Sequence, residues 1–352
     1  MTRYNKYINN FANEAEYETY INGSVAEAPN TALIDDTGKM IYTKILPNNY
    51  LFFGTTKGTQ DFMIGSSSSE YSSADCIQIH VVVEDDSGIN KMYVAPEDVL
   101  KIPKYFYSSY SGFNNTEGKK ILSIKKWKID TSQVTNMCCM FDGCSKLTTL
   151  DLINFDTSKV TNISCMFYGC SKFTTLDLSN FDTSNVTNMD STFSNCSSLI
   201  SLDLSNFDTS KVETTGYMFK DCSSLTSLDL SNFDTSNVIS MSSMFYDCSK
   251  LTTLDLTSFN TSKTSNIDYM FLSCSELNKL YLSSTFFNST SLTTYEFGYL
   301  YNWTDTESLA MFVEAITAHD GTGKTVRLTG NTKNALTTEQ KTAITNAGWT
   351  IS

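Results

Sequence analysis

The residues best placed to do chemistry are five aspartates spaced 26 residues apart, Asp151, Asp177, Asp203, Asp229 and Asp255. Each lies between two leucines, so the alternation predicts a strand with the leucines inward and the aspartates outward. Hydroxyl residues flank them on the outward side, among them Thr175, Ser201, Ser227 and Thr253. This face could bind a cationic or sugar-rich partner, or collect cations. The alternative is a solvated polar face whose carboxylates bond the hydroxyls.

Catalysis is the competing use of these carboxylates. Paired carboxylates serve glycosidases, but five copies along a ladder are not a single catalytic pocket. The segment "DGTGKT" (320–325) lacks the first glycine of a phosphate-binding loop, and its lysine leads into a predicted strand. Two isolated histidines provide neither a metal cluster nor a catalytic triad. We therefore expect no enzyme, no catalytic residue, no cofactor and no metal site; a glycan-processing enzyme is the last alternative.

The aspartates belong to a 26-residue unit that recurs through residues 121–282, for example "FTTLDLSNFDTSNVTNMDSTFSNCSS" from Phe173. Each unit reads as a short strand, a polar turn and a two-turn helix. The helix is predicted by Met137, Met140, Phe141 and Cys144, which have the spacing of one helical face. Such a unit cannot bury its apolar face alone, so neighbouring units must stack. Parallel stacking would place neighbouring aspartates about 5 Å apart, where they repel one another.

The pattern L-x-x-L-x-L at this period resembles a leucine-rich repeat, and "LDLSNFDTSNV…MSSMFYDCS" resembles the BspA-like class of bacterial surface proteins and gut-bacterial phages. The resemblance implies attachment or recognition rather than catalysis. One departure is phenylalanine where many such families stack asparagine. We expect an aromatic spine in place of that polar ladder, at Phe155, Phe181, Phe207, Phe233 and Phe259. A second spine is expected at Phe141, Phe167, Phe193, Phe219, Phe245 and Phe271.

The predicted fold is α/β: a leucine-rich-repeat solenoid over residues 121–282, with about seven strands in one parallel sheet. Residues 1–45 are predicted to be an adaptor with two helices before Gly23 and a hairpin after Pro29. Residues 46–120 form a small β-rich domain or an N-terminal cap. Residues 283–352 form a C-terminal cap with a helix at Thr306–His319, a strand in "KTVRLTG", a helix at Thr337–Asn346 and a last strand in "WTIS".

Composition narrows the partners and the compartment. A net charge of −13 argues against nucleic acid and anionic membranes. No apolar run is long enough for a transmembrane helix, and the first residues show no secretory signal. Six of the ten cysteines fall on the apolar stripe and are expected to be reduced and buried. Cys138, Cys139 and Cys165 lie off the stripe, Cys76 begins a predicted strand, and no C-x-x-C spacing suggests zinc.

We therefore expect a non-enzymatic interaction protein of a phage virion, of head or tail fibre or decoration type. Residues 1–45, which resemble N-terminal segments of virion proteins in gut-bacterial phages, would attach it to the particle. The solenoid would face a host surface protein or glycan, and homo-oligomerisation stays open. The alternative is a secreted or cell-surface adhesin, although no signal peptide, lipobox or wall anchor is visible in the sequence.

Overall fold

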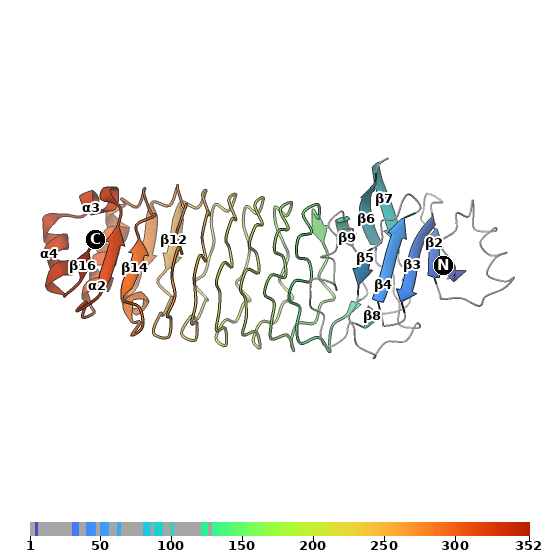
Figure 1. Ribbon diagram of the computed structural model, residues 1–352, viewed down its shortest axis with the longest axis horizontal. Helices are drawn as coiled ribbons and strands as arrows, with labels where there is room; N and C mark the ends of the chain where they lie inside the picture. Colours follow the sequence, from blue (N-terminus) through green and yellow to red (C-terminus); the bar gives the residue numbers. More distant parts are fainter. Residues whose placement is uncertain are drawn as a thin grey trace. The chain divides into compact units, whose positions relative to one another are not determined.

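The computed structural model describes residues 131–352 with their side chains and, within residues 1–130, the backbone of strands β1–β10. The chain folds as two compact units, Met1–Val160 and Thr161–Ser352. The described part is mixed α/β, with small parallel sheets and few helices (Figure 1). The predicted N-terminal helices lie outside the described residues, apart from Tyr4–Asn5, which form strand β1. Cys76 and the side chains of residues 1–130 lie outside them as well.

The first unit contains two larger sheets. One is antiparallel with the order β1-β2-β3-β4-β5, and the other has the order β11-β9-β6-β7. Strands β2 and β3 pair as an antiparallel hairpin after Pro29, and β4 to β7 lie within residues 46–120, for which a β-rich region was expected. The strands are β2 Asn30–Ile34, β3 Met40–Leu46, β4 Tyr50–Thr55, β5 Phe62–Ile64, β6 His80–Asp85, β7 Gly88–Tyr93, β8 Leu100–Lys101, β9 Ile121–Lys125, β10 Ile129–Asp130 and β11 Thr149–Leu150.

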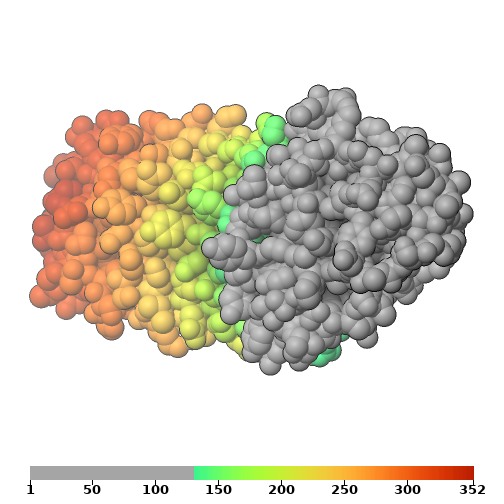
Figure 2. Space-filling view, turned by 45° about the vertical axis from the view of Figure 1, so that its right-hand side comes forward, coloured from blue at the N-terminus to red at the C-terminus, as the bar shows by residue number. Residues whose placement is uncertain are grey.

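In the second unit, consecutive repeats lie side by side in a row (Figure 1). Their colours form adjacent bands on the surface of Figure 2. Strand β12 (Thr253–Leu256) pairs in parallel with β13 (Lys279–Leu282), and Asp255 is opposite Tyr281. The leucines of the repeats are buried, as expected; Leu178 is 2 % exposed and Phe193 is 0 % exposed.

The single seven-stranded parallel sheet was a wrong prediction for the described repeats. The L-D-L segments at residues 176–178, 202–204 and 228–230 are not regular strands. One difference from a strand ladder lies in how the carbonyl at the end of the segment is satisfied. The side-chain amide of Asn206 donates to the carbonyls of Leu178 and Phe181 in the preceding repeat, at 3.0 and 2.8 Å. Asparagine side chains therefore take places that a strand ladder would fill with backbone N–H groups.

The two-turn helix was also a wrong prediction. The stripe of Ile163, Met166, Phe167 and Cys170 is buried, but these residues form consecutive tight turns. Two positions in each such segment have positive φ, for example Cys165 (55°) and Gly169 (70°), which no right-handed helix accepts. The segments are residues 162–170, 188–196, 214–222, 240–248 and 266–274, and together we name them the turn ribbon.

Hydrogen bonds explain why the turn ribbon replaces a helix. Alternate N–H groups donate to the next repeat, as in Cys165 to Asp190 at 2.8 Å and Phe167 to Thr192 at 3.0 Å. Groups between them close turns three residues back, as in Met166 to Ile163 at 3.0 Å. Four bonds of the first kind, from one repeat to the next, join each pair of neighbouring segments of the turn ribbon. The stacking of repeats therefore satisfies N–H donors that a helix would have satisfied internally.

Aromatic rings and cysteines fill the core beside the turn ribbon. The second predicted phenylalanine spine is confirmed from Phe167 to Phe271, with ring centroids 5.7–6.0 Å apart and rings 7–8° from parallel. The phenylalanines of the first spine, Phe155 to Phe259, are all buried. The aromatic spine does not replace a polar ladder, because Asn206 and Asn232, which precede Phe207 and Phe233, bond the previous repeat as described.

The C-terminal segment follows the predicted order of elements. Helix α2 (Thr306–Thr317), strand β15 (Thr325–Leu328), helix α4 (Thr338–Asn346) and strand β16 (Thr350–Ile351) confirm the expectations, and Gly348 ends α4 with a φ of 90°. The sequence did not predict η2 (Ser284–Phe287), β14 (Thr294–Phe297) or α3 (Gly330–Ala335). Strands β14, β15 and β16 form a parallel sheet.

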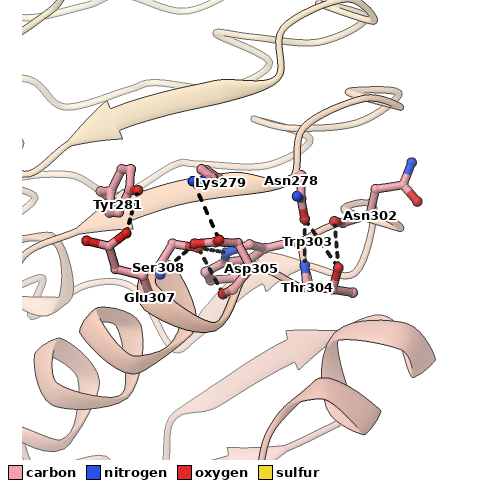
Figure 3. Close-up of polar contacts among 9 residues, drawn as sticks. All are labelled: Asn278, Lys279, Tyr281, Asn302, Trp303, Thr304, Asp305, Glu307 and Ser308. Carbon is pink, nitrogen blue, oxygen red and sulfur yellow. Dashed lines mark hydrogen bonds and ion pairs between the residues drawn. The ribbon is translucent and has the colours of Figure 1, made fainter.

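Polar contacts join the last repeat to this segment (Figure 3). Asp305 caps α2 by accepting the N–H of Ser308 at 3.0 Å, and Lys279 of β13 lies 3.7 Å from the same carboxylate. Tyr281 donates to Glu307 at 3.5 Å. Beneath these contacts Trp303 is buried and donates to the Ser308 hydroxyl at 3.2 Å. The helix therefore begins directly against the end of the repeats.

Candidate binding face

The aspartates face solvent, as predicted. Each follows one buried leucine and precedes another, and this alternation turns its carboxylate outward. Asp151 is half-buried, and Asp177, Asp203, Asp229 and Asp255 are exposed. The hydroxyl residues beside them, Thr175, Ser201, Ser227 and Thr253, are exposed too. We name these residues the aspartate row.

Each carboxylate of the aspartate row bonds the backbone two residues further on. Asp203 Oδ1 accepts the N–H of Ser205 at 3.0 Å, and Asp229 Oδ1 accepts that of Ser231 at 2.9 Å. Asp255 accepts both the N–H and the hydroxyl of Thr257, at 2.9 and 2.7 Å. The same short loop recurs at Asp151 with Ile153 and at Asp177 with Ser179. The carboxylates therefore help to end each L-D-L segment.

These bonds favour the charged form of Asp203 and Asp229. The pKa of Asp203 is lowered, first by the N–H of Ser205 and then by its hydroxyl. The pKa of Asp229 is lowered in the same way by Ser231, and repulsion from Asp203 raises it by less than these bonds lower it. The expected repulsion is thus present, but hydrogen bonding outweighs it. The pKa values of Asp203 and Asp229 are therefore lowered overall, which favours their negative charge.

A shallow groove of about 350 Å³ lies between two of the repeats that carry the row. Asp203 and Asp229 line it together with the serines of their repeats, Ser201, Ser205, Ser227 and Ser231. It offers acceptors and hydroxyls close together, which suits a ligand rich in hydrogen-bond donors or positive charge.

Sequence reasoning missed a second groove, of about 490 Å³, on the turn ribbon. Tyr168, Asn195, Asp221 and Asp247 line it, with serines of the same repeats. The pKa of Asp247 is raised, first by burial and then by the neighbouring charge of Asp221. Lys220 lies 3.7 Å from Asp221 and 5.0 Å from the ring centre of Tyr246. The signal in the sequence was the glycine, asparagine or aspartate found at the positive-φ position of successive repeats.

The cysteine ladder is buried as expected: Cys144, Cys170, Cys196, Cys222, Cys248 and Cys274. From Cys196 onward each thiol donates to the carbonyl of a phenylalanine in the preceding repeat, as in Cys222 to Phe193 at 3.2 Å. Burial raises the pKa of Cys196 to about 12, against an ordinary value near 9.0. Cys138, Cys139 and Cys165 are half-buried thiols.

The lysine of the "DGTGKT" segment, Lys324, makes contacts within the C-terminal segment. Lys324 precedes β15 directly, donates to the carbonyl of Ser289 at 2.9 Å and lies over the ring of Trp349 at 5.6 Å. Within residues 131–352, no three histidine, cysteine or acidic side chains gather closely enough to hold a metal ion. No helix in the described part of the chain is long and apolar enough to span a bilayer.

Repeats of 26 residues, joined by backbone bonds and by columns of identical side chains, define a repeat protein with polar outer faces. Residues 107–223 and 191–297 match the family described as "Mycoplasma protein of unknown function, DUF285". The two matches together span residues 107–297, more than half of the 352 residues, and the chain belongs to this family. This membership is consistent with the predicted repeat-type surface protein. No curated protein and no solved structure matches the chain.

Proposed function

We propose that the repeats form a leucine-rich-repeat solenoid of the BspA-like class, and that the protein is a non-enzymatic interaction protein. It presents the aspartate row to a partner on a host surface or within a virion. The observation that carries this proposal is the exposure of the same carboxylate and hydroxyl pattern in consecutive repeats.

The row keeps binding capacity after its own turns are made. An ionised carboxylate offers about four acceptor sites. At Asp203 and Asp229 the backbone N–H bonds Oδ1, so a partner that donates to Oδ2 would leave this bond of the turn intact. A ligand that donates to several carboxylates in succession would gain from the regular spacing of the repeats. Sugar hydroxyls, amino sugars, and lysine or arginine side chains have this chemistry.

The charge supports a protein or glycan partner over other classes. With a net charge of −13, the chain is expected to repel nucleic acid and anionic lipid surfaces. Residues 1–45, by their resemblance to virion segments, are proposed to attach the protein to a phage particle. A secreted or cell-surface adhesin is the alternative, since the repeat class serves both settings.

Two measurements test this proposal. Detection of the protein in purified phage particles would support the virion setting, and its recovery in a host wall or membrane fraction would support the adhesin.

The double variant Asp203→Asn, Asp229→Asn keeps the Oδ1 acceptors but removes two charges. We expect it to lose attachment to host cells or partner, while the matched variant Asp221→Asn, Asp247→Asn on the turn ribbon retains it. Unchanged attachment of the first variant would refute the role of the row.

A further inference from the structure

Cys138 and Cys139 are consecutive cysteines whose sulfur atoms lie 3.2 Å apart. Both side chains are half-buried, whereas the cysteines of the ladder are buried. The two cysteines therefore differ from the ladder in two respects, because the residues are partly exposed and their sulfur atoms touch each other.

The local backbone holds the pair in place. The N–H of Cys138 donates to Asn136 Oδ1 at 2.9 Å, and Cys139 has a φ of 59°, with its carbonyl accepting the N–H of Asp142 at 3.2 Å. Met137 and Met140, on either side, are anchored in the core. The sulfurs thus sit on a turn whose two ends are fixed, and they do not depend on a chance encounter of mobile side chains.

The pair is a property of one repeat. At the equivalent positions the later repeats have Ser164-Cys165, Asp190-Ser191, Gly216-Tyr217, Ser242-Ser243 and Asp268-Tyr269. Cys165 occupies the place of Cys139 with a similar φ of 55°, but without a preceding cysteine. It is a built-in comparison for the reactivity of a single thiol in the same turn.

We propose that Cys138 and Cys139 form a vicinal dithiol that a hydroperoxide oxidises reversibly to a disulfide between adjacent residues. One thiolate attacks a peroxide oxygen, the O–O bond breaks, and a sulfenic acid forms with release of water after protonation. The second thiol then attacks the sulfenic sulfur, forms the S–S bond and releases a second water. Two thiols and one hydrogen peroxide thus give one disulfide and two waters. This site is separate from the aspartate row and does not depend on the proposed binding function.

The contact geometry favours the second step over competing fates of the sulfenic acid. The attacking sulfur is already within 3.2 Å, so ring closure competes well with further oxidation and with capture by another molecule. Across a trans peptide the two Cα atoms are about 3.8 Å apart, closer than in most protein disulfides. Such a bond is expected to be reduced readily by a small dithiol.

The test treats the whole chain with limiting hydrogen peroxide, blocks remaining thiols with N-ethylmaleimide and maps the peptides by mass spectrometry. We expect the peptide with Cys138 and Cys139 to lose the mass of two hydrogen atoms and to escape alkylation, with dithiothreitol restoring both thiols. Cys165 is expected to give a sulfenic acid that dimedone traps. Alkylation of both Cys138 and Cys139 in chains whose Cys165 is oxidised, or their appearance in intermolecular disulfides, would overturn the proposal.

Variants separate proximity from general reactivity. Cys138→Ser is expected to leave Cys139 behaving as Cys165 does, with a trapped sulfenic acid and no disulfide; Cys139→Ser should do the converse. The unreacted ladder cysteines report that each variant is folded.

Phenylarsine oxide, which releases water as two thiols bind one arsenic, provides a readout without oxidation. One arsenic is expected per native chain at this peptide and none in either variant; equal capture by native chain and variants would also overturn the proposal.

Discussion

The hydroxyl of Thr209 exchanges two hydrogen bonds with the backbone of Asp234 in the next repeat. Oγ1 donates to the carbonyl oxygen at 2.9 Å and accepts the N–H at 2.8 Å. Thr183 makes the same exchange with Asp208, and Thr235 makes it with Asn260. These buried threonines form a polar ladder that ties successive repeats together at a fixed register.

The threonine ladder can be tested with Thr209→Val. The substitution is nearly isosteric but removes both hydrogen bonds to the backbone of Asp234, so we expect the free energy of unfolding to fall by about 1–3 kcal/mol. Thr209→Ser keeps the hydroxyl and loses one methyl group, at a cost of about 1 kcal/mol. Urea unfolding measures both, and equal losses would show that the exchange with Asp234 contributes little.

The cysteine ladder predicts a loss of stability at alkaline pH. The folded pKa of Cys196 is about 12, against about 9 for the unfolded thiol. Stability from this group is fully present below pH 9. It falls as pH rises toward 12, by about 1.4 kcal/mol per pH unit, because only the unfolded chain releases the proton.

Cys196→Ala isolates this effect from the ionisation of tyrosines, which both proteins share. The variant is expected to be about 1–2 kcal/mol less stable than the native chain at pH 8, because a buried group is lost. The difference should narrow as pH rises above 9. Urea unfolding at several pH values checks it, and a difference independent of pH would contradict the raised pKa.

The turn ribbon predicts that Asp247→Asn stabilises the protein at pH 7. The folded pKa of Asp247 is raised, first by burial and then by the charge of Asp221. Above the ordinary pKa of 3.8 the charged side chain therefore destabilises the folded state. Below pH 3.8 the side chain is neutral and this cost is absent. The gain should be under about 1 kcal/mol, since Asp247 is only partly buried and water screens its charge. It should vanish at pH 3. Asparagine also tolerates the φ of 52° at this position.

Asp203→Asn is the matched control for Asp247→Asn. The folded pKa of Asp203 is lowered by Ser205, so its charge adds stability above the ordinary pKa, and this stability is lost as pH falls through the folded pKa. We therefore expect a loss at pH 7 and no effect at pH 2. Melting temperatures of the two variants that move in the same direction at pH 7 would contradict the opposite pKa shifts.

The junction in Figure 3 predicts that Asp305 stabilises the start of α2. Asp305→Ala removes the acceptor for the N–H of Ser308 and is expected to cost about 1 kcal/mol. Asp305→Asn keeps an acceptor at the cap and loses only the ionic contact with Lys279, which is worth little at the surface. Thermal unfolding of both variants measures the difference. Equal losses in the two variants would assign the effect to the contact with Lys279 instead.

The sequence was sufficient for the repeats, their buried side chains and the outward aspartates, because each depends only on the period and on the polarity of residues. It was misleading for the stripe at Met137, Met140, Phe141 and Cys144, since consecutive turns can bury the same spacing as a helix. Glycine, asparagine and aspartate at the φ-positive positions, Gly169, Asn195, Asp221 and Asp247, carried the contrary information.

The polar ladders could not be inferred from spacing alone. Thr209 lies in a D-T-S segment that reads as an ordinary turn, and only stacking brings its hydroxyl to the backbone 25 residues later. The groove on the turn ribbon was missed for the same reason. Its lining residues are conspicuous only when the positions of four repeats are placed side by side.

The bonds between neighbouring segments of the turn ribbon have a mechanical consequence. Each repeat of the second unit is held by hydrogen bonds to its neighbours. A force that pulls the two ends apart therefore acts on every contact between repeats, and we expect the repeats to unfold one at a time. Unfolding of one 26-residue repeat would increase the contour length of the chain by about 90 Å, at roughly 3.4 Å per residue. Force spectroscopy on a tethered chain is expected to show a sawtooth with that increment. A protein that extends in this way would limit the force transmitted between the two structures to which its ends are attached.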